Sequence, residues 1–450
     1  MIERHPASFR DRSGYIYRKN GTLLRAVQPT YKAEYDALMK SGLYDQLVGD
    51  RLLIPHTEVT GGARGAYKTL KPEPVDFITY PYEWSFSQLK DAALATLEIQ
   101  RRALENGQTL KDASAYNIQF HQGAPTLIDT LSFERYKKGA PWIAYRQFCQ
   151  HFLAPLVLMS KVDVRLSQLL RVHIDGIPLD LAAELLPRKT RMRPGIYMHL
   201  VLHARAQQKY ESTAKKAKPR KVNVKALVAS LESLIKKLEY EPAGTEWGDY
   251  YTFTNYTDRS FREKGRLVER FIKNVKPKRV WDVGGNTGAF SRIASDAGIP
   301  TVSFDVDPAA VEKNYREAKK REETNLLPAV LDLTNPTPGI GWAHEERESV
   351  TDRGPVDMVL FLALIHHMAI GNNVPLSSVA DYVAKTCRHL VIEWVPKGDS
   401  QVNKLLATRE DIFDDYTQKG FEAAFSRRFK TVRKTKIKGT KRTLYLMRRK

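Results

Sequence analysis

The stretch VWDVGGNTGAF, residues 280 to 290, runs from a strand-like apolar segment through an acid into a bend with three glycines. On its C-terminal side, short β-branched or apolar runs alternate with helical periods, which indicates a parallel sheet covered by helices. The last residues predict an antiparallel hairpin that turns at Lys438-Gly439-Thr440 and extends the sheet edge. The sequence therefore predicts an α/β, doubly wound (Rossmann-like) fold. The expected strands are 279–283, 301–304, 327–331, 356–362 and 389–395, and two expected helices are 309–320 and 376–387.

The glycine bend is predicted to be a binding device. A strand, a glycine bend and a helix N-terminus let backbone approach a ligand closely, and exposed N–H groups there favour negative charge. The dinucleotide fingerprint G-x-G-x-x-G would need glycines where this chain has Asn286 and Ala289. The bend therefore disfavours NAD as its ligand.

The pattern Asp282-x-Gly284-x-x-x-Gly288, with Gly285 inside the loop, resembles the first motif of class I methyltransferases that use S-adenosylmethionine (SAM). That family commonly shows D-x-G-x-G-x-G, and here Asn286 replaces the middle glycine. Asparagine tolerates a left-handed backbone better than most residues, so the loop can keep its shape. The resemblance implies SAM as cofactor and a seven-stranded methyltransferase sheet over residues 245–450.

Two further acids stand at the ends of the next strands. Asp305 ends the second strand, where a carboxylate can accept both hydrogens of a ribose diol, and the resemblance assigns it this role for SAM. Asp307 is the second choice and is expected to cap the following helix. By the same resemblance, Asp332 accepts a hydrogen bond from the adenine amino group, and Leu333 lies against the ring. Each acid alone could equally be a cap or turn former, but three at successive strand ends favour binding.

The fourth strand is followed by His366 and His367, and the resembling family often has histidines there. Methyl transfer depends mainly on alignment, but a base helps when the acceptor is a hydroxyl, and either imidazole could take that proton near neutral pH. The alternative is that one ring packs under the sheet and the other faces solvent. The loop after the fifth strand is expected to bring Glu393, Trp394 and Asp399 to the same crevice. The Asn/Asp-Pro-Pro-aromatic motif of base-amine methyltransferases is absent, which disfavours a nucleic-acid base as acceptor.

Residues 1–185 form a different, α+β unit. An Asn20-Gly21 turn predicts a hairpin, residues 85–107 predict a long helix, and residues 75–84 predict an edge strand. Asp112, Asn117 and Asp129 have a spacing similar to the catalytic and metal loops of kinase-like proteins, which would make them the base and two metal-binding groups.

This second resemblance shows clear departures. No glycine-rich phosphate loop precedes the three residues, Leu110-Lys111 stands in place of His-Arg, and Arg25 occupies the place of a strand lysine. The sequence thus predicts a degenerate kinase-like or accessory domain, and acidic turn residues by chance are the alternative.

The net charge of +21 is concentrated in two tracts. Arg188–Lys225 holds twelve Lys or Arg against one acid, and Arg427–Lys450 holds twelve against none, so the remaining chain is nearly neutral. These tracts could bind RNA or another polyanion, or they could be a solvated connector over 186–244 and an edge hairpin protected by lysine.

Cysteine usage and hydropathy narrow the class of protein. The only cysteines, Cys149 and Cys387, can build neither a disulfide framework nor a cysteine-based zinc site, and no metal is expected. No apolar run is long enough to span a bilayer, so a cytoplasmic location is expected.

Three functions remain open from the sequence. The leading hypothesis is a SAM-dependent methyltransferase with a small-molecule acceptor. The others are a methyltransferase that acts on RNA or another polyanion, and a kinase-like phosphotransferase or ATP-binding regulator fused to a SAM-binding domain.

Overall fold

The computed structural model describes residues 2–206, 223–242 and 257–450 of the chain. These residues form two compact units. The first consists of Met1–Glu241 and the short segment Gly339–Arg347, and the second of Pro242–Pro338 and Glu348–Lys450. Over the described ranges, no helix combines the length and the apolar composition needed to cross a membrane.

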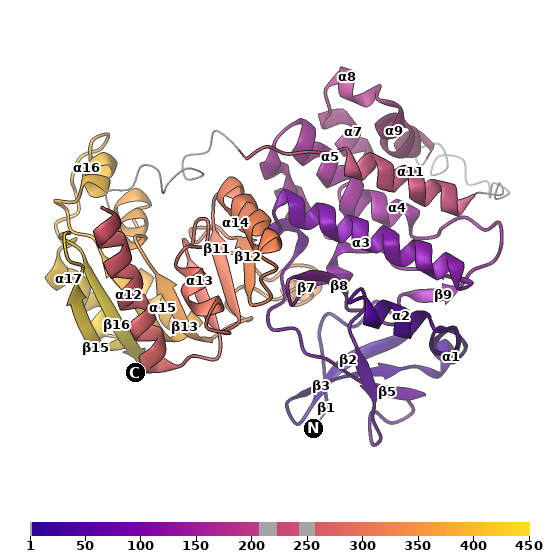
Figure 1. Cartoon of the computed structure of the whole chain (residues 1–450), viewed down its shortest axis with the longest axis horizontal. Helices are drawn as coiled ribbons and strands as arrows, with labels where there is room; N and C mark the ends of the chain where they lie inside the picture. The colour runs from indigo at the N-terminus through magenta and orange to yellow at the C-terminus, as the bar shows by residue number, and fades with distance from the viewer. Residues whose placement is uncertain (1, 207–222, 243–256) are drawn as a thin grey trace. The chain divides into compact units, whose positions relative to one another are not determined.

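The second unit is built on a seven-stranded sheet in the order β12-β11-β10-β13-β14-β16-β15 (Figure 1). The strands from β12 to β14 are parallel to their neighbours, and β16 pairs antiparallel with both β14 and β15. The chain starts in the middle with β10 and reverses direction there, so the expected doubly wound sheet and its C-terminal hairpin are confirmed. The strands are β10 (Val280–Val283), β11 (Thr301–Asp305), β12 (Leu326–Val330), β13 (Val356–Phe361), β14 (Cys387–Trp394), β15 (Phe429–Lys436) and β16 (Thr443–Arg449).

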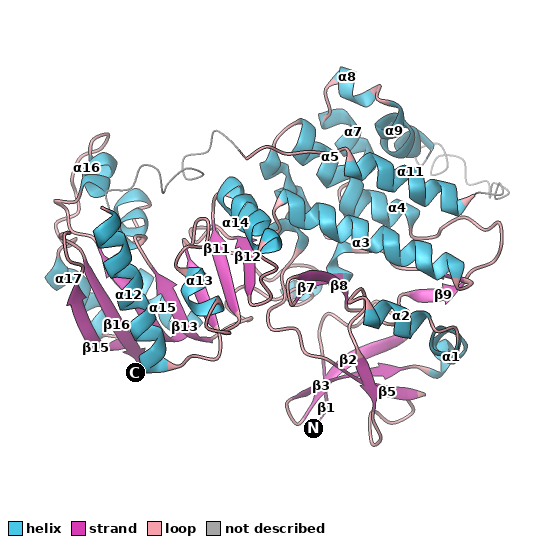
Figure 2. Ribbon diagram, viewed as in Figure 1, coloured by secondary structure: helices cyan, strands magenta, loops and turns pink. Residues whose placement is uncertain are grey.

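Helices cover both faces of this sheet (Figure 2). Because side chains alternate along a strand, β14 directs Val391 into the core shared with α12, while Trp394 stacks on the opposite face with Tyr416 and Phe421, at ring-centroid distances of 4.5 and 5.1 Å. The helices are α12 (Asp258–Val275), α13 (Ser291–Ser295), α14 (Pro308–Lys320), α15 (Leu376–Thr386), α16 (Ser400–Leu406), α17 (Gln418–Ser426) and the π-helical turn His367–Gly371.

The terminal hairpin places most of the second basic tract on an exposed edge. β15 is the outermost strand and is exposed along most of its length, and Gly439 turns the chain with a φ of +81°. Part of its charge is paired, since Lys434 contacts Glu422 and Arg428 contacts Asp381, both at 2.6 Å. Lysine and arginine on such an edge oppose pairing with further strands.

The first unit begins with a five-stranded antiparallel sheet in the order β1-β2-β3-β5-β4. Asn20 and Gly21 both have positive φ, 51° and 78°, so the expected hairpin with a two-residue turn is confirmed. The strands are β1 (Ile2–Arg4), β2 (Gly14–Lys19), β3 (Thr22–Val27), β4 (His56–Glu58) and β5 (Lys68–Pro72), with helices α1 (Lys32–Lys40) and α2 (Leu43–Gly49).

The rest of the first unit is mainly helical. The expected long helix is α3, which begins at a capping box in which Ser85 and Gln88 each bond the backbone N–H of the other. The elements are α3 (Phe86–Glu105), β6 (Gln108–Leu110) paired with β9 (Phe133–Arg135), β7 (Ile118–His121) paired with β8 (Ala124–Leu127), α4 (Tyr145–Phe148), α5 (Ala154–Lys161), α6 (Leu169–Val172), α7 (Leu179–Leu185), α8 (Arg188–Arg191), α9 (Pro194–Ile196) and α11 (Val224–Lys236).

The expected edge strand over 75–84 is wrong. Thr79 donates its N–H to the side-chain oxygen of Gln119 and accepts from the side-chain nitrogen, both at 2.9 Å, and Pro81 opens a 3-10 helix, Pro81–Glu83. A side-chain amide thus replaces the hydrogen bonds of a strand ladder, and proline disfavours continuing it.

The basic connector over 186–244 stays a prediction as a separate domain. Its described helices α8, α9 and α11 belong to the first unit, and Lys90 of α3 donates to the carbonyls of Lys236 and Leu238. Residues 207–222 of the first basic tract lie outside the described residues. Cys149 and Cys387 are both free and buried.

Candidate cofactor site

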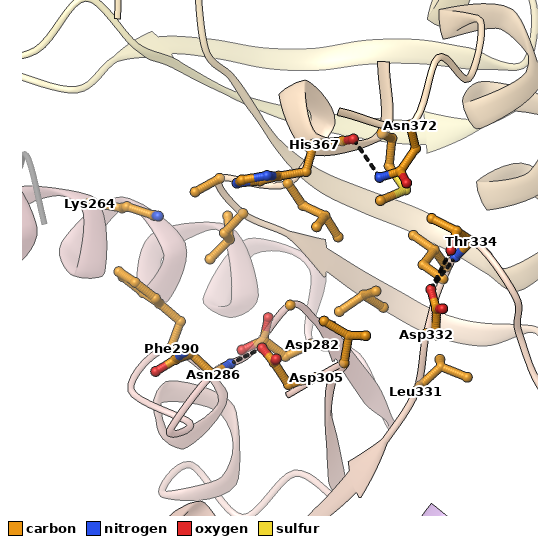
Figure 3. A pocket seen from close by; sticks show the side chains of 18 of the residues that line it. Lys264, Asp282, Asn286, Phe290, Asp305, Leu331, Asp332, Thr334, His367 and Asn372 are labelled. Carbon is orange, nitrogen blue, oxygen red and sulfur yellow. Dashed lines mark hydrogen bonds between the residues drawn. The ribbon is translucent and has the colours of Figure 1, made fainter. Parts of the chain in front are cut away.

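A cavity of about 360 Å³ lies in the second unit, at the carboxyl ends of β10, β11, β12 and β13 (Figure 3). Helix α12 and the turn after β13 complete its wall. Parallel strands place such crevices at the point where the strand order reverses. The predicted residues that line it are Asp282, Gly284, Asn286, Asp305, Asp332, Leu333 and His367, whereas Gly285, Gly288 and His366 stand behind the lining.

The bend has the backbone shape that the sequence predicts. Gly284 and Gly288 have φ values of 78° and 83°, and Asn286 adopts φ 50°. The left-handed region is unfavourable for most side chains, so the expectation that Asn286 substitutes for the family's middle glycine in this conformation is confirmed.

Two glycines of the bend are also required for space. A Cβ atom on Gly285 would lie 2.4 Å from Ser303 Oγ, and one on Gly288 would lie 2.5 Å from Asn314 Oδ1. At Gly284 the nearest atom, of Leu364, would be 3.4 Å away, so only the positive φ requires glycine there. Gly285 and Gly288 therefore shape the bend without contacting the cavity.

The amides of the bend are not directed at a ligand. The N–H groups of residues 284 to 288 all donate within the protein at 2.8 to 2.9 Å: Gly284 and Gly285 to Phe304 O, Asn286 to Asp305 Oδ2, Thr287 to Asn286 Oδ1, and Gly288 to Gly285 O. Helix α13 has only five residues. The expectation that the bend offers exposed N–H groups to a negative ligand is therefore wrong, and the bend contributes shape instead.

Asp282 and Asp305 are buried carboxyls at the cavity wall. Asp305 accepts from the N–H of Asn286 at 2.8 Å and of Asp307 at 2.9 Å, and Asp282 accepts from Ser291 Oγ at 2.7 Å. Burial raises the pKa of each to about 6. Each carboxylate oxygen can accept two hydrogen bonds, so these internal bonds leave Asp305 able to accept from a diol.

The third strand contributes Asp332 and Leu333 at another side of the cavity. Asp332 Oδ1 accepts from the N–H and the hydroxyl of Thr334, at 2.8 and 2.6 Å, which fixes the turn after β12. Asp307 does not line the cavity. It accepts from the N–H of Ala309 at 2.9 Å, so the expectation that it caps α14 is confirmed.

The two histidines differ in position. His367 lines the cavity across from Asn286 and Asp305, as Figure 3 shows, whereas His366 is buried and both its ring nitrogens lack a partner among the described residues. Burial and the charge of Arg442 lower the pKa of His367 to about 4, and burial with the neighbouring His367 lowers the pKa of His366 further. The expectation that these rings titrate near neutral pH is therefore wrong, since both are neutral there.

The expected acceptor loop after β14 does not reach the cavity. Glu393 and Trp394 are buried residues of β14, and Asp399 accepts from the N–H of Gln401 at the start of α16 and pairs with Arg442 at 2.7 Å. These side chains therefore serve the fold behind the lining.

The sequence analysis missed Lys264 and the apolar lining. Lys264 lines the cavity from α12 and is buried, with Nζ 2.7 Å from Glu393 Oε2 and 4.3 Å from the ring centroid of Phe290. It falls on the buried stripe of α12 with Ser260, Leu267 and Phe271. A lysine on the apolar stripe of an amphipathic helix is the signal that could have found it. The apolar lining comes from Phe261, Val283, Phe290, Val306, Leu331, Leu362, Ala363, Leu364 and Met368.

The residues of the kinase-like resemblance lie in the first unit. Asp129 accepts from Arg25 at 2.6 Å and from the N–H of Leu131 at 2.8 Å. Burial raises the pKa of Asp129, the charge of Arg25 opposes this, and the charge of Asp112 adds to it, so the two acids are near each other. Asn117 contacts Ser132 Oγ at 3.5 Å.

A metal site is not formed around these acids in the part of the chain that the structure describes. No group of three His, Cys, Asp or Glu there is arranged to hold a metal ion. The guanidinium of Arg25 occupies Asp129, which in a kinase-like protein would bind the metal. The kinase-like interpretation of Asp112, Asn117 and Asp129 stays a prediction.

The doubly wound sheet, the glycine bend and the acids from three neighbouring strands around one cavity define a class I SAM-dependent methyltransferase. The chain belongs to the family of the nodulation protein NoeA of Rhizobium meliloti (strain 1021). It is 35% identical to that protein over 456 residues, which cover 98% of this chain and 95% of the relative. No family model matches the chain.

Among solved structures, the N-methyltransferase NodS from Bradyrhizobium japonicum WM9 covers 43% of this chain and 97% of its own length, at 13% identity and a TM-score of 0.32. Magnesium protoporphyrin IX methyltransferase (ChlM) from Synechocystis PCC 6803, solved with bound SAH, covers 45% of this chain and 93% of its own, at 14% identity and a TM-score of 0.33. Likeness at this level carries no argument about the substrate of the present chain.

Proposed function

We propose that the protein transfers a methyl group from SAM to a small-molecule acceptor. The observation that carries this proposal is the convergence of Asp282, Asp305 and Asp332, from three neighbouring strands, on one cavity beside the glycine bend. A nucleoside needs hydrogen-bond acceptors for its diol and its amino group together with an apolar bed for its base, and this lining offers both. Bound SAM supplies an electrophilic methyl group on a sulfonium, which becomes a neutral thioether when the methyl group leaves.

We assign the residues as follows. Asp305 accepts the ribose hydroxyls, Asp332 accepts from the adenine amino group, and Leu333 packs against the adenine ring. The bend, with Gly284 at its cavity side, holds the cofactor close to β10 through shape. The contribution to rate comes from alignment of acceptor and methyl carbon, because the departing thioether needs no acid.

His367 is the residue we assign to the acceptor. It faces the cavity opposite the acids and is neutral at pH 7, so it can accept a hydrogen bond from a hydroxyl or amine and orient it. Its lowered pKa disfavours complete removal of a proton before methyl transfer. His366, behind it, is a packing neighbour with ring centroids 4.2 Å apart.

A small molecule is favoured over a polyanion by the charge around the cavity. Three acids line it, and among the described lining residues only Lys264 carries a fixed positive charge. A nucleic-acid phosphate would meet repulsion there, whereas the exposed cations of β15 are partly paired with acids.

Calorimetry with SAM tests the cofactor, and mass spectrometry tests the acceptor. The wild-type protein is expected to bind SAM, and Asp305→Ala combined with Gly284→Val is expected to abolish binding. Extracts of cells with and without the protein are then compared for metabolites whose mass differs by one methyl group. Absence of SAM binding by the folded wild type would defeat the proposal.

A further inference from the structure

The cavity contains a second polar pair that the assignment of adenine and ribose does not use. Lys264 and Asp282 both line it, and the charge of each shifts the pKa of the other toward its ionised form. The pair comprises one cation and one anion within electrostatic reach, in a wall that is otherwise apolar or acidic. An α-amino acid zwitterion carries the complementary charges.

The order of the strands gives the direction of a ligand along the cavity. Asp332 follows β12, Asp305 ends β11 and Asp282 belongs to β10, and these three strands are adjacent in that order. Glu393, the ion-pair partner of Lys264, is on β14, beyond β13. Figure 3 shows Lys264 and Asp332 at opposite ends of the cavity. A ligand with its base at Asp332 and its ribose at Asp305 therefore directs its remaining group toward Lys264.

We infer that Lys264 and Asp282 bind the amino-acid end of SAM, with the Lys264 ammonium on the carboxylate and Asp282 on the α-ammonium. This inference rests on the proposed function, because it concerns the same cofactor. It makes the protein selective for adenosyl thioethers that carry the complete amino acid. Phe290, whose ring centroid is 4.3 Å from Lys264 Nζ, forms the apolar side of this subsite.

Glu393 acts in this subsite as a positioning residue. It does not line the cavity, its side chain is fully buried, and it bridges Lys264 Nζ at 2.7 Å and Arg442 Nη1 at 3.2 Å. Arg442 is in turn held by Asp399 at 2.7 Å. Lysine has three N–H donors, so one can hold Glu393 while another reaches a ligand carboxylate. The network thus keeps the Lys264 ammonium at the wall instead of in solvent.

The test uses two ligands that differ only in the amino-acid end. S-adenosylhomocysteine has it, and 5′-methylthioadenosine keeps the adenosyl thioether without it. Calorimetry on the full-length wild type is expected to show tighter binding of S-adenosylhomocysteine. In Lys264→Met, which keeps the length of the side chain, the affinity for S-adenosylhomocysteine is expected to fall about 30-fold or more, and that for 5′-methylthioadenosine to stay within about twofold.

Two further variants control for folding and charge. Lys273→Met removes an exposed lysine of the same helix that pairs with Glu269, and it is expected to bind both ligands like the wild type. Lys264→Met with Glu393→Gln removes both charges of the buried pair, so no uncompensated carboxylate is left, and it is expected to lose S-adenosylhomocysteine alone. Lys264→Arg is expected to recover part of the affinity.

The outcomes separate the two proposals. If the wild type binds both ligands equally, or if Lys264→Met weakens both equally or neither, the subsite is overturned while the proposed function stands. If the folded wild type binds neither ligand, the proposed function fails and the subsite fails with it. Selective loss of S-adenosylhomocysteine in both Lys264 variants, with binding unchanged in Lys273→Met, establishes the subsite.

Discussion

The two units both carry acids that follow short strands, but the acids have different partners. In the second unit, Asp282 and Asp305 are held by a hydroxyl and by backbone N–H groups, and both face a cavity. In the first unit, Asp129 is held by the guanidinium of Arg25 at 2.6 Å. Neutral donors leave the negative charge of a carboxylate available to a ligand, whereas an arginine neutralises it. Equivalent sequence patterns therefore differ in what they can bind.

The largest expected effect breaks the bend of the second unit. Gly288→Ala would force a side chain into a left-handed backbone and place its Cβ about 2.5 Å from Asn314 Oδ1. We expect loss of measurable S-adenosylhomocysteine binding by calorimetry and a decrease of about 2–4 kcal/mol in the free energy of unfolding.

The matched control is Gly298→Ala. Gly298 also has a positive φ, 78°, but nothing lies within 4 Å of its Cβ position. This variant is expected to lose only about 1 kcal/mol and to retain its ligand affinity. Equal losses of binding in the two variants would show that the space at the bend does not matter.

The next effect compares the acids directly. Asp305→Asn is expected to weaken S-adenosylhomocysteine binding about 10- to 100-fold, because a charged acceptor of the diol is lost. Asp129→Asn is expected to leave that affinity unchanged and to lower the free energy of unfolding by about 1–3 kcal/mol, since a mostly buried ion pair with Arg25 is broken. Calorimetry and denaturant unfolding on both variants measure this contrast. A loss of affinity in Asp129→Asn would contradict it.

A smaller effect is expected from pH. Burial raises the pKa of Asp305 to about 6, so below that pH the free protein holds a proton that a diol-binding carboxylate must release. Affinity for S-adenosylhomocysteine is therefore expected to rise with pH, by about tenfold between pH 5 and pH 7, and then to level off. Calorimetry across this range, with Asp305→Asn as the flatter control, gives the measurement. Affinity that falls as pH rises would reverse the assignment of a charged acceptor.

The smallest expected effect concerns nucleotide binding by the first unit. Because Arg25 occupies Asp129, ATP with Mg²⁺ is expected to shift the melting temperature of the wild type by less than about 1 °C, and Asp129→Asn is expected to change this little. A shift of several degrees that Asp129→Asn removes would instead support a phosphate-binding kinase-like site.

The sequence predicts the second unit well because its signals are local. The bend, the strands around it and the cap at Asp307 follow from glycine, β-branched and acidic residues close together in the chain. The lysine at the wall was missed because its partner, Glu393, is more than a hundred residues away in sequence. The neutral state of His366 and His367 was missed because burial and the charge of Arg442 arise only after folding.

Long-range side-chain bonds also explain the error in the first unit. Residues 75–84 have the apolar content of a strand, but the amide of Gln119 takes both hydrogen bonds of Thr79. The same reasoning applies to the bend, where the acceptors of Gly284 and Gly285 lie on β11 and could not be read from the bend alone. The direction of backbone N–H groups is a tertiary property.

The bend between β10 and α13 is closed by its own hydrogen bonds. It is thus preorganised, and a ligand that enters loses no free energy to ordering this part of the backbone. Amide hydrogens of residues 284 to 288 should accordingly exchange slowly in the free protein already, and their protection should change little when cofactor or product occupies the neighbouring space. Turnover can then proceed through many cycles of filling and emptying around an unchanging backbone.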